Sequence, residues 1–191
     1  MGYLDEPPVE GAVADLYAAD EARLGYVANY TRAFAYRPEV YRAWQALNTA
    51  VKAAMDPVRY EVATVAAAGE LRSSYCSLAH GQVLAGQLGE DEAVRVAEGR
   101  SGDPAVAAVA ALARQVVSEP SAVVPADLET LRALGFSDAD VLDVVLAAAA
   151  RSFFSSVLEA TGTEPDPGYA ALPDRLRSAL TVGRPVQAAD G

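Results

Sequence analysis

Apolar residues recur along the chain at steps of three and four, which is the spacing of one face of an α-helix. After Pro38, for example, Val40, Trp44, Leu47 and Val51 follow one another at such steps. A second apolar face is predicted in the last long helix, from Val141, Val144, Val145, Phe153 and Leu158. The pattern is typical of amphipathic helices that pack around a shared core.

Start and stop signals divide the chain into a series of short helices. Proline is tolerated in a first helical turn, aspartate and serine cap helix starts, and glycine ends helices. These signals predict helices over about residues 13–24 and 29–35, from 38, from 57 to about 69, from 74 to about 86, and over 90–98, 104–118, 125–134 and from 138. We therefore predict an all-α fold.

The length of 191 residues and the hydrophobic share of 52%, much of it alanine, suit one compact helical domain. We place this domain at residues 1–165. Beyond Gly162 the chain becomes rich in proline, glycine and charge, so residues 166–191 are expected to form a C-terminal tail.

The formal net charge of −11 argues against nucleic acid and anionic membranes as partners, because both select basic surfaces. No apolar run reaches the length of a membrane span, since Asp143 and Arg151 bracket the most apolar stretch, Ala147–Ala150. The N-terminal residues lack the features of a signal peptide, and one cysteine cannot form an internal disulfide. We expect a cytoplasmic protein.

The only cysteine and the only histidine, Cys76 and His80, lie four residues apart. On a helix this spacing places both on one face. Ser73 and Ser74 are candidate N-caps, so Cys76 is expected in the first turn, where free N–H groups and the helix dipole favour a negative charge. A nearby imidazole that takes the proton would further favour the reactive thiolate.

Glu61 lies on the preceding helix, which the break at Gly69–Arg72 is expected to fold back beside Cys76 and His80. Its carboxylate could orient the imidazole, as the third member of a nucleophile–base set. Each residue also has a purely structural interpretation: a buried small thiol, a packing histidine and a surface carboxylate. A metal site is not expected, because zinc needs three or four protein ligands and no Cys-x-x-Cys or His-x-x-x-His is present.

The segment from Glu61 to His80 resembles the core motif of the alkylhydroperoxidase D (AhpD)-like, carboxymuconolactone decarboxylase family. That motif is a glutamate, eleven residues, Cys-x-x-Cys, three residues and a histidine, and Glu61, Ser73, Cys76 and His80 fall at its spacing. Residues 25–38 resemble the family's lead-in segment and residues 126–162 its second half, in the longer, peroxidase-related branch.

The resemblance implies an all-helical fold, with a catalytic core at about residues 38–98, that assembles as a homo-oligomer (dimer, trimer or hexamer). It implies that Cys76 attacks a small-molecule hydroperoxide while His80 and Glu61 relay protons, without a cofactor. Ser73 stands where the family has its resolving cysteine. A serine cannot form a disulfide, so an oxidised Cys76 would need an external thiol reductant.

Two other interpretations remain open. The chain could be an acid–base enzyme similar to the decarboxylase members, with His80 as acid or base and Arg72 or Arg59 binding a substrate carboxylate. It could also be a non-catalytic oligomeric member that retains the scaffold alone.

Overall fold

The computed structural model describes residues 2–188, and all regular structure in this range is helical, as predicted. The α-helices are α1 (Ala12–Leu24), α2 (Asn29–Phe34), α3 (Pro38–Ala54), α4 (Pro57–Glu70), α5 (Ser74–Leu88), α6 (Glu90–Ala97), α7 (Pro104–Ser118), α8 (Pro125–Ala133), α9 (Asp138–Ala160) and α10 (Asp174–Leu180). Two 3-10 helices are η1 (Pro120–Ala122) and η2 (Pro167–Ala171).

The helix starts follow from short-range capping. The Asp56 side chain accepts a hydrogen bond from the Arg59 backbone N–H at 3.0 Å, with Pro57 in the first turn of α4. Ser137 and Asp140 form a reciprocal capping box at the start of α9. Such caps satisfy N–H groups that would otherwise lack partners, so they fix where helices begin.

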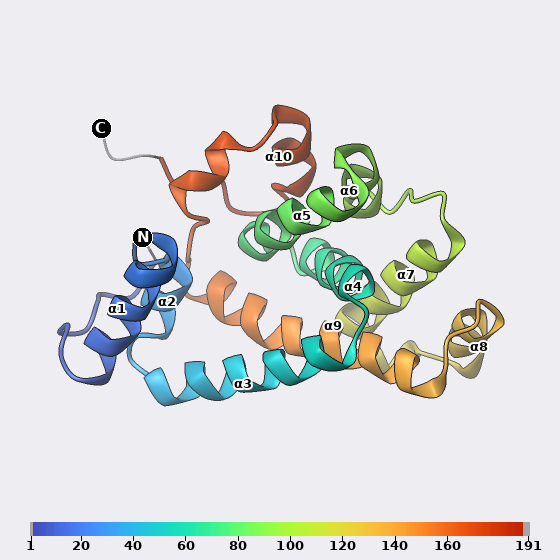
Figure 1. The fold of residues 1–191 in the computed structure, drawn as a ribbon, viewed down its shortest axis with the longest axis horizontal. Helices are drawn as coiled ribbons and strands as arrows, with labels where there is room; N and C mark the ends of the chain where they lie inside the picture. Colours follow the sequence, from blue (N-terminus) through green and yellow to red (C-terminus); the bar gives the residue numbers. More distant parts are fainter. Residues whose placement is uncertain (1, 189–191) are drawn as a thin grey trace.

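The core is built around α4, which lies at the centre of the molecule between α5, α7 and α9 (Figure 1). Every residue from Tyr60 to Ala68 in this helix is buried. Its alanines let neighbouring helices approach closely on several sides, since a small side chain leaves the packed helices close together. The Glu61 carboxylate is therefore carried into the interior by a helix that is almost completely enclosed.

A second, aromatic-rich cluster lies where α1, α2 and the start of α3 meet the start of α5 and the end of α9. Its buried members are Leu16, Tyr17, Phe34, Ala35, Tyr41, Ala68, Tyr75, Cys76, Phe154 and Leu158. Cys76 therefore belongs to this cluster, beside the main core.

The C-terminal segment differs from the tail expected from residue 166 onward. It forms η2 and α10, and Leu176 and Leu180 are buried in the main core against α5 and α6. Gly81 of α5 permits this approach, because a Cβ there would lie 2.4 Å from the Leu180 side chain. The apolar contacts of a seven-residue helix thus outweigh the local proline and glycine content.

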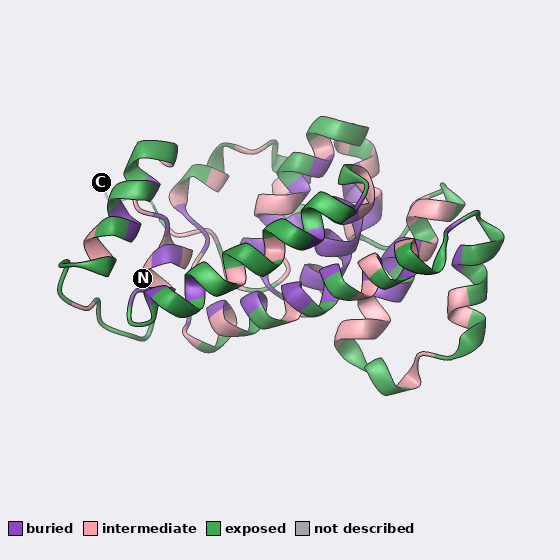
Figure 2. Ribbon diagram, turned by 60° about the horizontal axis from the view of Figure 1, so that its bottom comes forward, coloured by how far each residue is buried: buried purple, intermediate pink, exposed green. Residues whose placement is uncertain are grey.

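Helix α9 is, by length and composition, the one helix among residues 2–188 that could cross a membrane. Half of its most apolar window is buried inside the fold, where it packs against α3, α4 and α7. Figure 2 shows that buried residues concentrate where the central helices meet. These contacts are those of a core helix in a folded domain.

The apolar face predicted for α3 is only partly buried. Val51 is buried and Trp44 is half-buried, whereas Val40 and Leu47 are exposed. Phe153 on α9, also predicted to face the core, is exposed as well. The predicted helices are correct. Helical periodicity identifies an apolar face, but it does not show whether that face packs inside the fold or is exposed to solvent.

Candidate functional site

Cys76 lies in the first turn of α5, directly after the Ser73 N-cap, as the sequence predicted. The residue is only 2% exposed, and it lines a cavity of about 530 Å³. His80 lines the same cavity one turn further along. The helix thus presents both groups to one space, in which free N–H groups at the helix start favour an anionic sulfur.

The polar partner of the Cys76 sulfur is Arg151 of α9. The Arg151 Nη1 donates to Cys76 Sγ at 3.6 Å, and its Nη2 donates to the Tyr60 hydroxyl at 3.3 Å. Arg151 is 2% exposed and forms no ion pair with a carboxylate of residues 2–188. A buried guanidinium needs a compensating charge, and the Cys76 thiolate is the group in position to supply it.

The guanidinium remains charged in this interior. Burial alone would lower the pKa of Arg151, but the neighbouring Cys76 and Tyr60 side chains hold it above its ordinary value. Tyr60 in turn donates to Asn48 Oδ1 at 2.6 Å, so its hydroxyl is oriented to accept from Arg151. The result is a fixed cation directed at the sulfur.

His80 and Glu61 meet as the sequence predicted. His80 Nδ1 lies 2.6 Å from Glu61 Oε2, and Lys52 Nζ lies 3.7 Å from the other oxygen, Glu61 Oε1. Burial, together with the charge of Arg151, lowers the pKa of His80 to about 4, despite the opposing effect of Glu61. The imidazole is therefore neutral near pH 7.

The Glu61 contact fixes the tautomer of this neutral ring. A carboxylate can only accept, so Nδ1 carries the proton and Nε2 keeps its lone pair. His80 is thus equipped as a proton acceptor. The sequence suggested an imidazole that helps to hold the thiolate; the structure instead assigns the cationic role to Arg151.

Ser73, at the position of the family's first cysteine, is completely buried and does not line the cavity. Its side chain makes no capping hydrogen bond, although its backbone is the N-cap of α5. Arg59 and Arg72, the alternative carboxylate anchors, also lie outside this cavity. Arg59 pairs with Asp140 at 2.7 Å, and Arg72 is exposed at the turn before α5.

Sequence reasoning missed Arg151 as a site residue. It was noted only as the charge that bounds the apolar stretch Ala147–Ala150. A single arginine within a long apolar helix was the available signal, because such a charge is buried only when it has a partner. That partner, Cys76, lies 75 positions away in the sequence.

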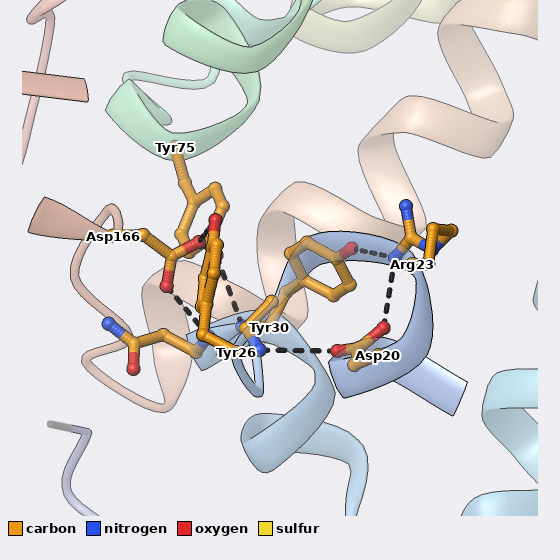
Figure 3. Close-up of polar contacts among 8 residues, drawn as sticks. Asp20, Arg23, Tyr26, Tyr30, Tyr75 and Asp166 are labelled. Atoms are coloured by element: carbon orange, nitrogen blue, oxygen red, sulfur yellow. Dashed lines mark hydrogen bonds and ion pairs between the residues drawn. The ribbon is translucent and has the colours of Figure 1, made fainter. Parts of the chain in front are cut away.

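The far wall of the cavity is held by a polar network around Asp166 (Figure 3). The buried Asp166 carboxylate accepts from the Tyr75 hydroxyl, from Tyr26 at 3.3 Å and from the Asn29 backbone N–H at 2.9 Å. Burial raises the pKa of Asp166 and also that of Tyr75. These bonds tie the segment before η2 to α2 and to the start of α5.

No group of three or more histidine, cysteine, aspartate or glutamate side chains within residues 2–188 gathers as a metal site. The two pairs nearest to the chemistry are Arg151 with Cys76 and His80 with Glu61. Such an arrangement can stabilise a thiolate and accept a proton.

No protein-family model and no curated protein sequence matches the chain. Among solved structures, an uncharacterised peroxidase-related protein with an AhpD core from Ralstonia eutropha JMP134 has a TM-score of 0.76 at 22% identity, covering 96% of this chain and 98% of that one. A peroxidase-related protein from Silicibacter sp. TM1040 has the same TM-score of 0.76 and identity of 22%, covering 89% and 94%.

A more distant structure is that of the debrominase Bmp8, in which an alanine variant of a cysteine was solved in complex with 2,3,4-tribromopyrrole. It has a TM-score of 0.66 at 14% identity and covers 94% of each chain. At these identities the similarity establishes the architecture. The chain therefore has the all-α AhpD-like fold of the peroxidase-related proteins, as the motif between Glu61 and His80 led us to expect.

Proposed function

We propose that the chain is a thiol-dependent peroxidase in which Cys76 attacks a hydroperoxide. The observation that carries this proposal is the contact of Cys76 Sγ with Arg151, a buried guanidinium that pairs with no carboxylate of residues 2–188. The same cavity is lined by His80, whose ring is held from behind by Glu61. A thiolate is the nucleophilic form of cysteine, and a fixed cation beside it favours that form.

In the oxidative step, the thiolate attacks the terminal oxygen of a hydroperoxide ROOH. The S–O bond forms as the O–O bond breaks, which yields the sulfenic acid Cys76–SOH and the alkoxide RO⁻. The thiol proton, taken by His80 Nε2, passes to the alkoxide and gives ROH. Arg151 stabilises the negative charge as it moves from sulfur to oxygen, and Glu61 stabilises the imidazole while it holds the proton.

Regeneration requires thiols from outside the chain, because Cys76 is its only cysteine. One external thiol R′SH condenses with the sulfenic acid to form the mixed disulfide Cys76–S–S–R′ and water. A second R′SH then releases the Cys76 thiol and R′SSR′. Ser73 takes no part in this exchange.

The direct test is peroxide consumption in the presence of excess dithiothreitol, with trapping of the sulfenic acid by dimedone and intact-protein mass spectrometry. We expect turnover and one dimedone adduct for the wild type, and neither for Cys76→Ser. The His80→Gln variant should retain the adduct but react about a hundredfold more slowly. Ser77→Ala, a change in the next buried residue of α5, serves as the matched control.

A Cys76→Ser variant that consumes peroxide like the wild type would refute the proposal. Activity towards a small lactone acid that is lost in His80→Gln but kept in Cys76→Ser would select the acid–base interpretation instead. Arg151 would then be the carboxylate anchor, since Arg59 and Arg72 lie elsewhere. A well-formed oligomer with neither activity would favour the non-catalytic scaffold.

The size and aromatic walls of the cavity support a second candidate, thiol-dependent dehalogenation of an aromatic compound. Bmp8, a debrominase with the same fold, was solved with a brominated pyrrole. The balanced reaction is ArBr + 2 R′SH → ArH + R′SSR′ + HBr. Bromide release from tribromopyrrole that depends on Cys76 would support this candidate, and its absence alongside peroxide turnover would exclude it.

A further inference from the structure

The cavity in front of Cys76 is far larger than a peroxide group requires. Its volume of about 530 Å³ lies well within the range of sites that enclose an organic ligand. A water molecule, which is similar in size to half of hydrogen peroxide, occupies only about 30 Å³ in the liquid. The site thus has room for a substrate with a substantial organic part.

Seven phenylalanine, tryptophan and tyrosine side chains line this cavity, beside polar residues. Its aromatic lining residues are Tyr26, Tyr30, Tyr41, Trp44, Tyr75, Phe154 and Tyr169. Trp44 and Phe154 stack at a centroid distance of 4.1 Å, and Tyr30 packs against Phe154 at 5.9 Å. Flat faces of this kind favour a planar ring over an aliphatic chain of similar area, because ring pairs gain about 0.5–1.5 kcal/mol beyond burial.

The aromatic walls are also held in fixed positions. Figure 3 shows that the Tyr75 and Tyr26 hydroxyls donate hydrogen bonds to Asp166. The Tyr30 hydroxyl accepts a hydrogen bond from Arg23, which also forms an ion pair with Asp20. Anchored side chains lose little further entropy when a ligand binds, which increases affinity.

The charge of the lining is opposite to that of the whole protein. Arg23, Lys52 and Arg151 line the cavity, whereas no aspartate or glutamate of residues 2–188 does. The chain as a whole carries a formal charge of −11, and Lys52 is its only lysine. Three of the 15 basic residues thus line this cavity, whereas Asp20 and Glu61, the carboxylate partners of Arg23 and Lys52, are not among its lining residues.

We propose that the cavity binds a planar aromatic anion, with its ring against the Trp44–Phe154 wall and its negative group beside Lys52. Lys52 is paired with Glu61 at 3.7 Å, but its side chain is 48% exposed, so its ammonium group keeps donors for a ligand. Arg151, by contrast, is 2% exposed and contacts Cys76 Sγ. The inference extends the proposed function, because it makes the organic part of the substrate of Cys76 an aromatic acid.

Trp44 supplies the readout, because it is the only tryptophan of the chain and lines the cavity. Benzoate is titrated into the Cys76→Ser protein, which binds without turnover, and Trp44 emission is excited at the red edge of its absorption, where benzoate does not absorb. Two analogues serve as comparisons: benzyl alcohol keeps the aromatic ring but lacks the charge, and cyclohexanecarboxylate keeps the charge but lacks the planar ring. We expect saturable binding of benzoate at least about tenfold tighter than of either analogue, or about 1.4 kcal/mol.

Substitution of Lys52 tests whether its ammonium group contacts the carboxylate of the ligand. Lys52→Met should weaken benzoate binding about fivefold to tenfold and leave benzyl alcohol unchanged. The matched control is Arg175→Met, which also removes one cation paired with a carboxylate, Asp91, but far from the cavity. It should leave both affinities as in the parent.

Equal affinity for benzoate and benzyl alcohol, or for benzoate and cyclohexanecarboxylate, would overturn the inference. So would an equal effect of Lys52→Met and Arg175→Met. Turnover of hydrogen peroxide and of an aromatic hydroperoxide by the wild type is measured separately. Turnover without selective benzoate binding would refute the inference alone, whereas selective binding without turnover would refute the peroxidase and leave the aromatic-anion site.

Discussion

At the scale of single residues, the central feature is a buried arginine whose partner is a thiol. Removing one member of a buried charge pair typically costs about 3–5 kcal/mol, because the remaining charge stays unsolvated. Arg151 Nη1 lies 3.6 Å from Cys76 Sγ, so a buried cation faces the sulfur directly. His80 is kept neutral beside the same cation, as the proposed role of a base requires.

The ionisation of His80 is a direct consequence of this arrangement. The ring's pKa of about 4, against an ordinary value of 6.5, means that the unfolded chain takes up a proton before the folded one does. The neutral His80 therefore contributes to the free energy of unfolding above pH 6.5. As the pH falls from 6.5 towards 4, this contribution is lost, and the loss is at most about 3 kcal/mol.

His80 is the only histidine, so its ring proton resonance can be followed by NMR without ambiguity. We expect it to titrate well below pH 6. Urea unfolding should show a decline in stability between pH 6.5 and 4 that is reduced in His80→Gln. A ring that titrates at 6.5 or above would contradict the neutral base.

Ser73 offers a gain-of-function prediction. In the variant Ser73→Cys, the introduced thiol would lie three residues before Cys76 at the helix start, which is the Cys-x-x-Cys arrangement of disulfide-forming sites. We expect peroxide to convert the two thiols into a disulfide, detected as a loss of two hydrogens by intact mass. Ser77→Cys is the control, since adjacent helical residues do not face each other.

At the scale of elements, the sequence predicted most of the helices because their starts depend on local chemistry. Asp56–Pro57, Pro104 and Ser137 each mark the start of an observed helix. Helix α10 was not predicted, because only its contacts with α5 and α6 stabilise it. The same distinction holds for the site: the spacing of Cys76 and His80 is local, whereas Arg151 is brought in by tertiary packing.

The docking of α10 depends on Gly81. A methyl group there would meet the fully buried Leu180 at 2.4 Å, so Gly81→Ala should cost about 1–3 kcal/mol through overpacking. Leu180→Ala alone should cost about 2–5 kcal/mol through a cavity. Urea unfolding should show that the double variant loses less free energy of unfolding than the two single variants lose in sum. Additive costs would show that the two side chains do not compete for space.

At the scale of the whole molecule, an apolar surface runs over α3 and α9, two helices that lie side by side (Figure 1). Its exposed members include Leu47 at 50%, Leu142 at 55% and Phe153 at 45%. Exposed apolar patches on soluble domains commonly mark interfaces. This surface agrees with the homo-oligomer expected from the resemblance, which stays a prediction.

Sedimentation velocity tests that prediction. The wild type should sediment as a species larger than the 19.9 kDa chain, and the double variant Leu47→Glu, Leu142→Glu should sediment as a monomer with an unchanged helical spectrum. Leu134→Glu, an exposed leucine after α8, is the control and should leave the oligomer intact. A monomeric wild type at micromolar concentration would contradict an interface at this surface.

The most direct test of the proposed chemistry is the pH dependence of Cys76 alkylation by iodoacetamide, compared between the wild type and Arg151→Met. Cys76 is the only cysteine, so one rate reports on one sulfur. We predict that Cys76 is alkylated more slowly in Arg151→Met than in the wild type at neutral pH, and that Arg151→Lys restores part of the rate. Superimposable profiles of the wild type and a folded Arg151→Met protein would contradict the claim that this guanidinium activates Cys76.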